Sequence, residues 1–189
     1  MRVDADALIS RFLQGDTASF ERLYDHYAAR LVGFLRSLGA SREAAEDLAQ
    51  RAWLKALEAL GNYRPEGRFR PWLFRIAHHL WLDEVRSGRE RGRGAMAPGP
   101  DAEGAPQRQG EPVDERTESP RDAAIAHEER GLVENALHEL PDEMRRTVLL
   151  RIDANLTFRE IAEEMDCSLG TALWRMQEAE KRLRRMLNP

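Results

Sequence analysis

The sequence predicts an all-α protein made of two small helical domains joined by a flexible linker, with a helix-turn-helix in the second domain. Three observations predict this fold. The chain of 189 residues is 33% charged but only 7% aromatic, and it has almost no alternating runs of valine, isoleucine and threonine, which favours helices over sheets. Residues 88–120 hold half of all the glycines and prolines and few large apolar side chains, as flexible linkers do. Residues 157–187 have the pattern of two amphipathic helices joined by a tight turn.

Turn and capping residues divide each domain into helices. In the N-terminal domain, residues 1–87, we expect helices at about 4–14, 17–38, 41–60 and 70–86. Asp16 and Ser41 are the expected N-caps of two of them. In the C-terminal domain, residues 121–189, we expect helices at about 120–139, 141–152, 157–165 and 168–187. Pro141 suits a first helical turn, and Thr157 with Glu160 forms a capping box.

Composition excludes several classes of protein. A net charge of −4 argues against a free-standing protein that coats nucleic acid non-specifically. The single Cys167 cannot form an intramolecular disulfide and has no ligand partners at suitable spacing, so we expect no metal site and no cofactor. No apolar run approaches the roughly 18 residues that cross a bilayer, and the first residues lack the pattern of a signal peptide. We therefore expect a soluble, cytoplasmic protein without membrane insertion.

The helix expected over residues 44–60 has an apolar side and a polar side with one leucine in it. The apolar side, assigned to the core, consists of Ala45, Leu48, Ala49, Ala52, Trp53, Ala56, Leu57 and Leu60. The polar side consists of Asp47, Gln50, Arg51, Leu54 and Glu58. Leu54 at its centre suggests a docking surface for another protein. The alternative is a solvated face with one stray leucine.

The segment FRPWLFRIAHHLWLDEVR, residues 69–86, combines arginines with aromatic side chains. One stripe of the expected helix is apolar and consists of Leu73, Ile76, Ala77 and Leu80. The opposite stripe consists of Arg75, His78, His79, Leu82 and Arg86. A basic face flanked by Trp72, Phe74 and Trp81 suits single-stranded nucleic acid, because arginine follows the phosphates while aromatic rings stack on unpaired bases. The alternative is that these aromatic side chains are core and the arginines only solvate the surface.

The two histidines in this segment do not suggest a metal site. His78 and His79 are adjacent, so on a helix their side chains diverge by about 100° and cannot easily chelate one ion.

The segment TFREIAEEMDCSLGTALWRMQEAEKRL, residues 157–183, predicts a helix-turn-helix. The inner face of its first helix consists of Phe158, Ile161, Ala162 and Met165. After a tight turn, the inner face of the second consists of Leu169, Ala172, Met176, Ala179 and Leu183. In such a motif the second helix enters the major groove of DNA. Plain helical hairpins give the same pattern.

Taken in order, three stretches and the variable linker resemble the extracytoplasmic-function (ECF) group of bacterial RNA polymerase sigma factors. The stretches are AEDLAQRAWLKALE, FRPWLFRIAHHLWLDEVR and LPDEMRRTVLLRIDANLTFREIAEEMDCSLGTA. The resemblance implies that the first domain binds the clamp of core RNA polymerase and melts the minus-10 promoter element, while the second reads the minus-35 element. It also implies a regulator, commonly an anti-sigma protein that clamps both domains.

The resemblance assigns roles to particular residues. Asp47, Gln50 and Leu54 match the clamp-binding helix, whereas Arg51 stands where an acidic residue is more usual. The positions that match the melting segment are Phe69, Trp72, Arg75 and Arg86. His79 replaces a customary asparagine there, so we expect base capture with an altered preference.

The helix that should read the minus-35 element departs further from the family. Leu173 replaces a lysine, and Glu178 and Glu180 stand among positions that are usually basic. Helical geometry points Leu173 and Glu180 toward the edge of the core. It points outward Thr171, Trp174, Arg175, Glu178, Lys181, Arg182 and Arg185. Glu178 can accept a hydrogen bond from cytosine N4, and Trp174 can pack on thymine methyl groups. Phosphate contacts are then expected from Arg175, Lys181, Arg182, Arg184 and Arg185.

The leading hypothesis is an initiation factor that binds core RNA polymerase, directs it to specific promoter DNA and opens the minus-10 element. We expect no enzymatic activity, because no nucleophile, histidine and acid are grouped in the sequence. The departures at Trp174 and Glu178 keep a second hypothesis open: a sigma-like decoy or adaptor that binds polymerase or an anti-sigma protein without initiating transcription. An ordinary helix-turn-helix repressor is disfavoured, since a duplex binder has no use for base-stacking side chains.

Overall fold

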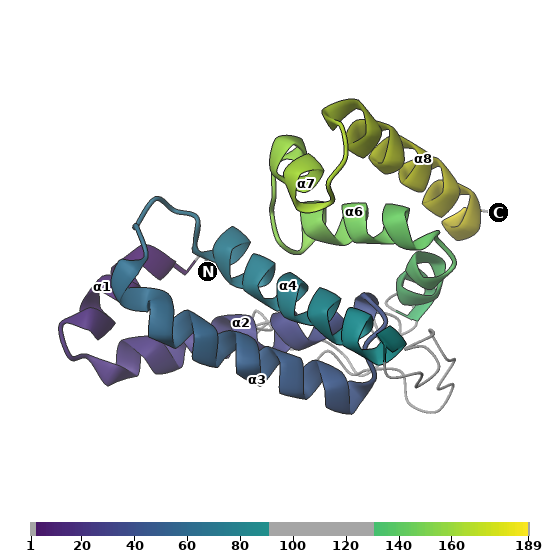
Figure 1. Ribbon diagram of the computed structural model, residues 1–189. Helices are drawn as coiled ribbons and strands as arrows, with labels where there is room; N and C mark the ends of the chain where they lie inside the picture. Colours follow the sequence, from purple (N-terminus) through teal and green to yellow (C-terminus); the bar gives the residue numbers. More distant parts are fainter. Residues whose placement is uncertain (1–2, 91–130, 189) are drawn as a thin grey trace, which may run out of the picture. The chain divides into compact units, whose positions relative to one another are not determined.

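The computed structural model describes residues 3–90 and 131–188, which belong to two compact helical units (Figure 1). The first unit contains α1 (Ala5–Leu13), α2 (Thr17–Ser37), α3 (Arg42–Ala59), a 3-10 helix (Leu60–Asn62) and α4 (Phe69–Glu90). In the second unit residues 131–138 are helical and are followed by α6 (Asp142–Ile152), α7 (Phe158–Glu164) and α8 (Leu169–Leu187). The regular elements within the described residues are all helical, which confirms the expected fold class.

Side-chain caps begin most of these helices where the sequence predicts. Asp16 accepts a hydrogen bond from the Ser19 amide, and Ser41 accepts one from the Ala44 amide. Thr157 and Glu160 form the expected capping box at the start of α7. Thr157 Oγ1 accepts a hydrogen bond of 3.3 Å from the Glu160 amide, and Glu160 Oε2 accepts one of 2.8 Å from the Thr157 amide. Each cap fixes the residue at which a helix begins, and so sets which side chains face the core.

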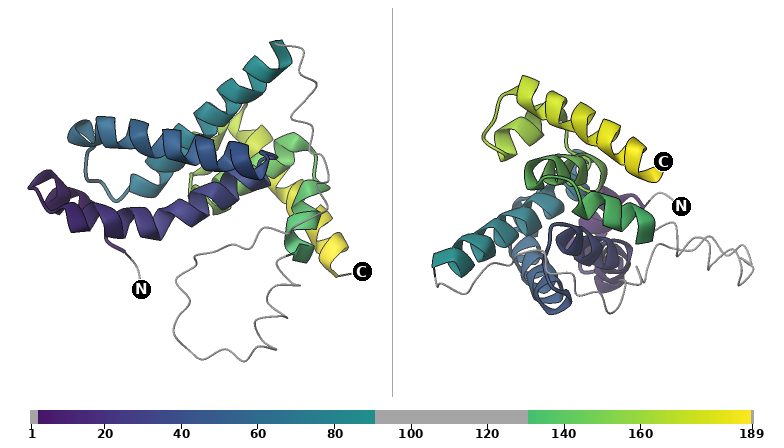
Figure 2. Two further views of the ribbon diagram at one scale, coloured as in Figure 1. Left: turned by 90° about the horizontal axis from the view of Figure 1, so that it is seen from below. Right: turned by 90° about the vertical axis from the view of Figure 1, so that its right-hand side faces the viewer.

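The core of the first unit forms where α2, α3 and α4 pack side by side, as two further views show (Figure 2). Phe34 of α2 and Phe74 of α4 meet there, with ring centroids 5.2 Å apart. The predicted core side of α3 is buried with one exception. Leu57 was expected inside but is 39% exposed, because it lies three residues after the outward Leu54 and shares its side of the helix.

The last helix of the first unit is longer than predicted. The glycine at position 88 suggests that the helix ends near Arg86, but α4 continues to Glu90. A glycine in a helix interior costs only about 1 kcal/mol relative to alanine, and packing of the preceding turns offsets this. The predicted linker thus has its first three residues in α4, and its residues 91–120 lie outside the described part of the chain, as does the start of the helix expected at about 120–139.

The second unit has its own core between α6 and α8. Leu140, Met144 and Val148 pack with Ala179, and Met176 and Leu183 border this cluster. The small side chains of Ala172 and Ala179 are fully buried, which lets α8 approach its neighbours closely. Leu169 was expected on this inner face but is exposed, because it begins α8 beyond the edge of the contact with α6 and α7.

Crossing a bilayer requires a helix of about 20 predominantly apolar residues. Within residues 3–90 and 131–188, no helix is long and apolar enough to cross a membrane.

Candidate nucleic-acid and protein interfaces

The polar side of α3 faces outward as the sequence predicts. Asp47, Gln50 and Glu58 are exposed, and the side chain of Leu54 in their midst is 55% exposed. The exposed Leu57 enlarges this apolar spot, since residues three apart on a helix are neighbours. The α3 face, defined as Asp47, Gln50, Arg51, Leu54 and Glu58 together with Leu57, therefore has an apolar centre and a polar rim, as protein-binding surfaces do.

Arg51 of the α3 face forms ion pairs with two acidic side chains. Its Nη1 atom lies 3.3 Å from Asp47 Oδ2 on the same helix and 3.6 Å from Glu84 Oε2 on α4. Both ion pairs are partly exposed, so each contributes little to stability. Together they place the guanidinium between an acidic side chain of α3 and one of α4.

Most of the aromatic side chains in residues 69–86 belong to the core. Phe69 is only 1% exposed, and Phe74 and Trp81 are buried as well. The ring of Phe69 lies 5.5 Å from that of Tyr27, 5.8 Å from that of Tyr63 and 5.7 Å from that of Trp72. Phe74 and Trp81 therefore lie in the core, as the alternative for the flanking aromatic residues expected, and Phe69 offers almost no side-chain surface to a base in this structure.

The two adjacent histidines of α4 have different environments. His78 was placed on the outward stripe, but it is 0% exposed and stacks on Trp81 with ring centroids 5.9 Å apart. The placement is wrong because the buried side of α4 includes Phe74, Ala77 and Trp81, and His78 lies between the first and last of these on that side of the helix. His79 is exposed, as expected.

Trp72 is the aromatic residue of this segment that reaches the surface. It is half-buried, and it lines a shallow surface cavity of about 540 Å³ between α3 and α4 that is wide open to solvent. The other lining residues are Lys55, Glu58, Ala59, Asn62 and Ile76. Arg75 is half-buried, and Arg86 is exposed with its Nη1 atom 3.8 Å from Asp83 Oδ1. The cavity lining thus combines an aromatic ring and apolar side chains with polar ones, a composition that suits a planar polar ring.

Four of these cavity residues were not predicted from the sequence. Lys55 and Ala59 come from α3, Asn62 from the 3-10 helix and Ile76 from α4, and they come together only through the packing of these elements. No local motif marks them. Ile76 even belongs to the stripe assigned to the core.

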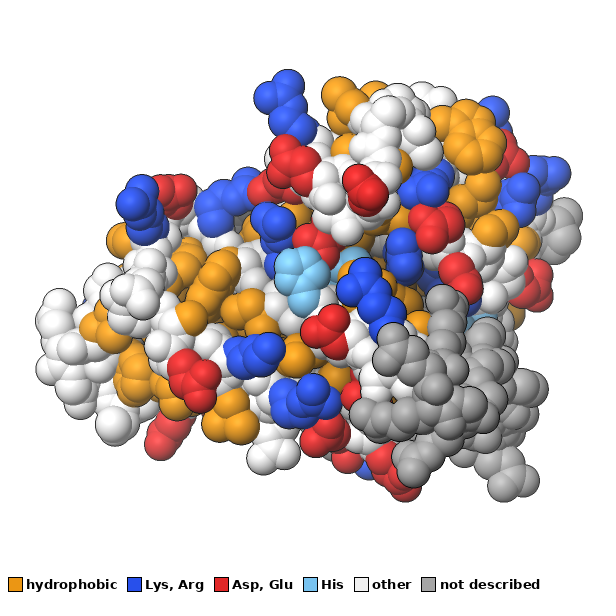
Figure 3. Space-filling model, in the orientation of Figure 1, with side chains coloured by type: hydrophobic (Ala, Val, Ile, Leu, Met, Phe, Trp, Pro, Cys, Tyr) orange, Lys and Arg blue, Asp and Glu red, His pale blue; other side chains and the backbone are white. Residues whose placement is uncertain are grey.

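On α8, the outward position of Trp174 is confirmed. Its side chain is 56% exposed, Lys181 is exposed, and Thr171 is half-buried with its Oγ1 atom 2.8 Å from Ser168 Oγ. Leu173 and Glu180, expected at the edge of the core, are both exposed. Figure 3 shows one face of the molecule, on which hydrophobic side chains lie among both positive and negative ones. On α8, the exposed Trp174 is an apolar group on the same helix as the exposed Glu180 and Lys181.

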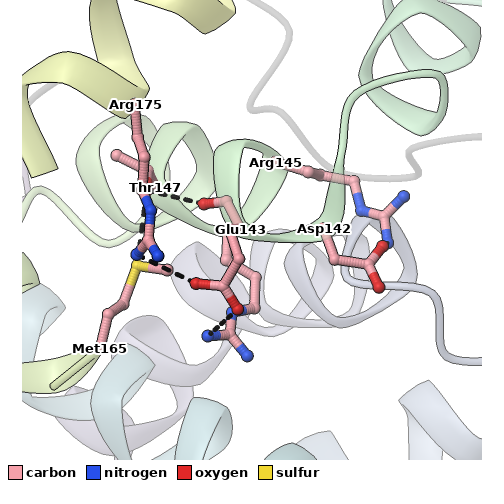
Figure 4. Close-up of polar contacts among 7 residues, drawn as sticks. Asp142, Glu143, Arg145, Thr147, Met165 and Arg175 are labelled. Carbon is pink, nitrogen blue, oxygen red and sulfur yellow. Dashed lines mark hydrogen bonds and ion pairs between the residues drawn. The ribbon is translucent and has the colours of Figure 1, made fainter. Parts of the chain in front are cut away.

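Arg175 does not point into solvent as predicted. Its side chain is 17% exposed, and its Nη1 atom lies 3.0 Å from Glu143 Oε2 on α6 (Figure 4). The other oxygen of Glu143 lies 3.1 Å from Arg146 Nη2. The correction has a simple cause: α6 supplies a carboxylate within reach, and a partly buried guanidinium is stabilised by such a partner.

Glu178 is engaged in a similar way. Its Oε1 atom accepts a hydrogen bond of 3.2 Å from Arg182 Nε and lies 4.0 Å from Arg185 Nη2. The Glu178 side chain is 23% exposed, so it keeps a small accessible surface. Glu143 on α6 and Glu178 on α8 thus partly neutralise two arginines that were expected to contact DNA, Arg175 and Arg182.

Comparison with known families defines the class of this protein. Residues 23–91 match the family Sigma-70 region 2, and residues 130–183 match the family Sigma-70, region 4. The first match spans the α3 face and the Trp72 cavity, and the second spans the helix-turn-helix. The two helical units are therefore those of a promoter-recognition subunit of bacterial RNA polymerase.

Relatives along the whole chain define the group. The chain is 30% identical to the RNA polymerase sigma-H factor of Pseudomonas aeruginosa over 96% of its own length and 93% of that protein. It is 28% identical to the ECF RNA polymerase sigma-E factor of Haemophilus influenzae, over 97% and 95% of the two chains. It is 30% identical to the ECF sigma factor SigK of Mycobacterium tuberculosis, over 98% and 94%. The chain belongs to the ECF sigma factors, and it is a transcription initiation factor that directs core RNA polymerase to promoters.

Solved structures support the fold. The structure of CnrH in complex with the cytosolic domain of CnrY matches with a TM-score of 0.60 at 20% identity, covering 98% of each chain. The sigma factor RpoE of Bartonella quintana, solved in complex with the anti-sigma factor NepR, matches with a TM-score of 0.58 at 22% identity, covering 89% of this chain and 96% of that one.

The ion pair between Glu178 and Arg182 on α8 predicts how this helix responds to the loss of one negative charge. Glu178→Gln removes the carboxylate charge that holds Arg182, so we expect tighter binding to duplex promoter DNA and a salt dependence steeper by about one unit of slope. The measurement is the affinity of the complex with core polymerase for promoter fragments over a salt series. Glu180→Gln is the matched control, because it removes the same charge from an exposed neighbour. A loss confined to promoters with one particular C·G pair would mean instead that Glu178 reads cytosine.

Proposed function

We propose that this sigma factor uses three surfaces: the α3 face to bind the polymerase clamp, the Trp72 cavity to capture an unpaired minus-10 base, and α8 to read the minus-35 element. The observation that carries the proposal is the open cavity beside Trp72, which begins at the rim of the α3 face, since Glu58 belongs to both. Polymerase bound to the α3 face would therefore hold promoter DNA directly over the cavity.

The α3 face supports docking by its chemistry. An exposed leucine within a polar rim resembles the centre of an interface, where a few desolvated side chains contribute most of the binding energy. Asp47, Gln50 and Glu58 would supply polar contacts around Leu54. Arg51, held by Asp47 and Glu84, would present its charge in a fixed direction.

Base capture at the Trp72 cavity would stabilise the open promoter. Flipping a base out of the duplex costs a few kcal/mol, and stacking on an aromatic ring contributes about 1–3 kcal/mol per base. Trp72 offers the ring, while Lys55 and Asn62 offer polar groups in the cavity lining. Arg75, His79 and Arg86 lie on the same helix and would follow the strand. Phe69 and His78 would act from the core, by supporting the shape of this helix.

In the second unit the reading helix would rely on Trp174, Thr171 and Lys181 for exposed contacts. Arg175 and Arg182 would be oriented by Glu143 and Glu178 and keep their remaining donors for phosphate or bases. We assign residues 1–87 with the end of α4 to the region 2 domain, residues up to about 120 to the linker, and residues 121–189 to the region 4 domain.

The proposed role also implies where the protein acts and how it is regulated. The protein would act in the cytoplasm, where polymerase and DNA are, and it would catalyse no reaction of its own, because polymerase supplies the chemistry. The relative from Bartonella quintana was solved with an anti-sigma factor, and we propose that a protein of that kind also regulates this chain.

Run-off transcription tests the proposal. The purified chain is combined with bacterial core polymerase and fragments of the source genome, and the products are sequenced. Discrete start sites that share an upstream motif are the expected result. Tight polymerase binding without any transcripts, while a control sigma factor is active, would identify a decoy or adaptor instead and make Trp174 a protein anchor.

Leu54→Asp tests the polymerase interface. The substitution places a charge at the centre of the α3 face, so we expect a loss of at least about 2 kcal/mol in polymerase affinity with unchanged helical content. Leu13→Asp is the matched control, because Leu13 is a leucine of similar exposure in the same unit, on α1. Equal losses in both variants, or loss of the circular dichroism signal, would contradict the assignment of the α3 face.

Trp72→Ala tests base capture. It removes the aromatic wall of the cavity, so we expect promoter opening to weaken by about 1–3 kcal/mol while polymerase binding is kept. Opening is followed by permanganate reactivity of unpaired thymines. Trp72→Phe keeps a ring for stacking and should retain most of the activity. Equal loss of polymerase binding and of opening would mean that Trp72 acts only as a core residue.

A further inference from the structure

A short loop connects the 3-10 helix to α4 (Figure 1). The carboxylate of Asp6 on α1 holds this loop at both ends. Asp6 Oδ1 accepts a hydrogen bond of 2.9 Å from the Tyr63 hydroxyl, and Asp6 Oδ2 accepts one of 2.6 Å from the Gly67 amide. The two partners are four residues apart and lie about sixty residues from Asp6 in the sequence. Asp6 is partly buried, which strengthens hydrogen bonds to a charged acceptor.

Within the described residues, few other contacts are seen that would hold the exposed part of this loop besides the two hydrogen bonds to Asp6. Gly67 has φ +69°, in the left-handed region that glycine adopts without strain, and the side chains of residues 64–66 are exposed. Within the loop itself the Glu66 amide donates to the Arg64 carbonyl at 2.9 Å. A tight exposed turn has little packing to hold it, so the two hydrogen bonds to Asp6 restrict its movement.

The same carboxylate is connected to the cavity. Tyr63 directly follows Asn62, which lines the cavity, and its ring lies 5.1 Å from that of Trp72. The other neighbour of the Tyr63 ring is the buried Phe69, at 5.8 Å. Burial and the hydrogen bond to Asp6 raise the pKa of the Tyr63 hydroxyl, which therefore remains a donor throughout the physiological range. Tyr63 thus transmits the position of Asp6 to the wall of the cavity.

We infer that Asp6 is a positioning residue for promoter opening: it fixes the loop of residues 63–68 and, through Tyr63, the Trp72 ring against which an unpaired base is held. The inference rests on the proposed function of the Trp72 cavity. The loop also carries Arg64 and Arg68, so its position sets where two positive charges meet the DNA backbone. Asp6 itself contacts no DNA, and it acts on the strand through Tyr63 and Gly67.

Asp6→Ala tests the inference with Asp4→Ala as its matched control. Asp4 caps the same helix by accepting a hydrogen bond of 3.1 Å from the Ala7 amide, so its loss removes the same charge and weakens the first turn of α1, while the Asp6 carboxylate is kept. Hydrogen exchange of the full-length chain is measured over residues 63–69. We expect the Gly67 amide to exchange at least about tenfold faster in Asp6→Ala and to change much less in Asp4→Ala, because a weakened first turn still carries the carboxylate that holds the loop.

Promoter opening provides the functional readout. The complexes with core polymerase are mixed with a promoter found in the run-off experiment that carries 2-aminopurine in its minus-10 element. We expect Asp6→Ala to open this promoter about tenfold more slowly than Asp4→Ala, with equal polymerase affinity, because a small misplacement of a binding group has a large effect on rate. Asp6→Asn, which can still accept from Gly67 and can donate to the Tyr63 oxygen, should restore most of the rate.

The outcomes separate the inference from the function on which it rests. Equal opening rates in Asp6→Ala and Asp4→Ala, with wild-type protein active, would overturn the inference alone. Unchanged exchange at Gly67 in Asp6→Ala would overturn it as well, since the loop would then not depend on Asp6. A wild-type protein that binds polymerase but opens no promoter would overturn the proposed function, and the inference with it.

Discussion

Phe69 packs against rings from three different parts of the first unit, and the position of α4 depends on this contact. Its neighbours are Tyr27 on α2, Trp53 on α3 and Tyr63 before α4. A ring held from three directions fixes where the first turn of α4 begins and how that helix is rotated. The rotation leaves Trp72 at the edge of the core, one turn further along, where it is supported on one side and accessible on the other. The burial of Phe69 therefore determines that Trp72 is partly exposed.

In the second unit, carboxylates limit the positive charge that the protein offers to DNA. Glu143 pairs with Arg175 and Arg146, and Glu178 pairs with Arg182. Such pairs reduce the attraction to phosphate that every DNA sequence offers equally. The net charge of −4 has the same effect for the whole chain. A sigma factor bound to polymerase can rely on its partner for non-specific affinity, so its own surface can favour discrimination.

Helical periodicity predicted the elements well, because caps and turns are local and each leaves a signal within four residues, as Ser41 and Thr157 do. It also predicted the outward side of α3, because α2 and α4 both pack against the opposite side of that helix. It failed for His78, Leu57 and Arg175, because periodicity gives the direction of a side chain but not what lies opposite it. The cavity beside Trp72 and the contacts of Asp6 could not be predicted from the sequence, since they join segments that only the fold brings together.

The loop before α4 is fixed at Tyr63 and at Gly67, while the three residues between them face solvent. Substitutions at positions 64–66 can therefore change the surface offered beside the cavity without disturbing the frame that carries it. Exposed turns tolerate such changes far better than the elements they connect. Under the proposed role of the Trp72 cavity, promoter preference would change through a few mutations in this one segment, with the stability of the domain preserved.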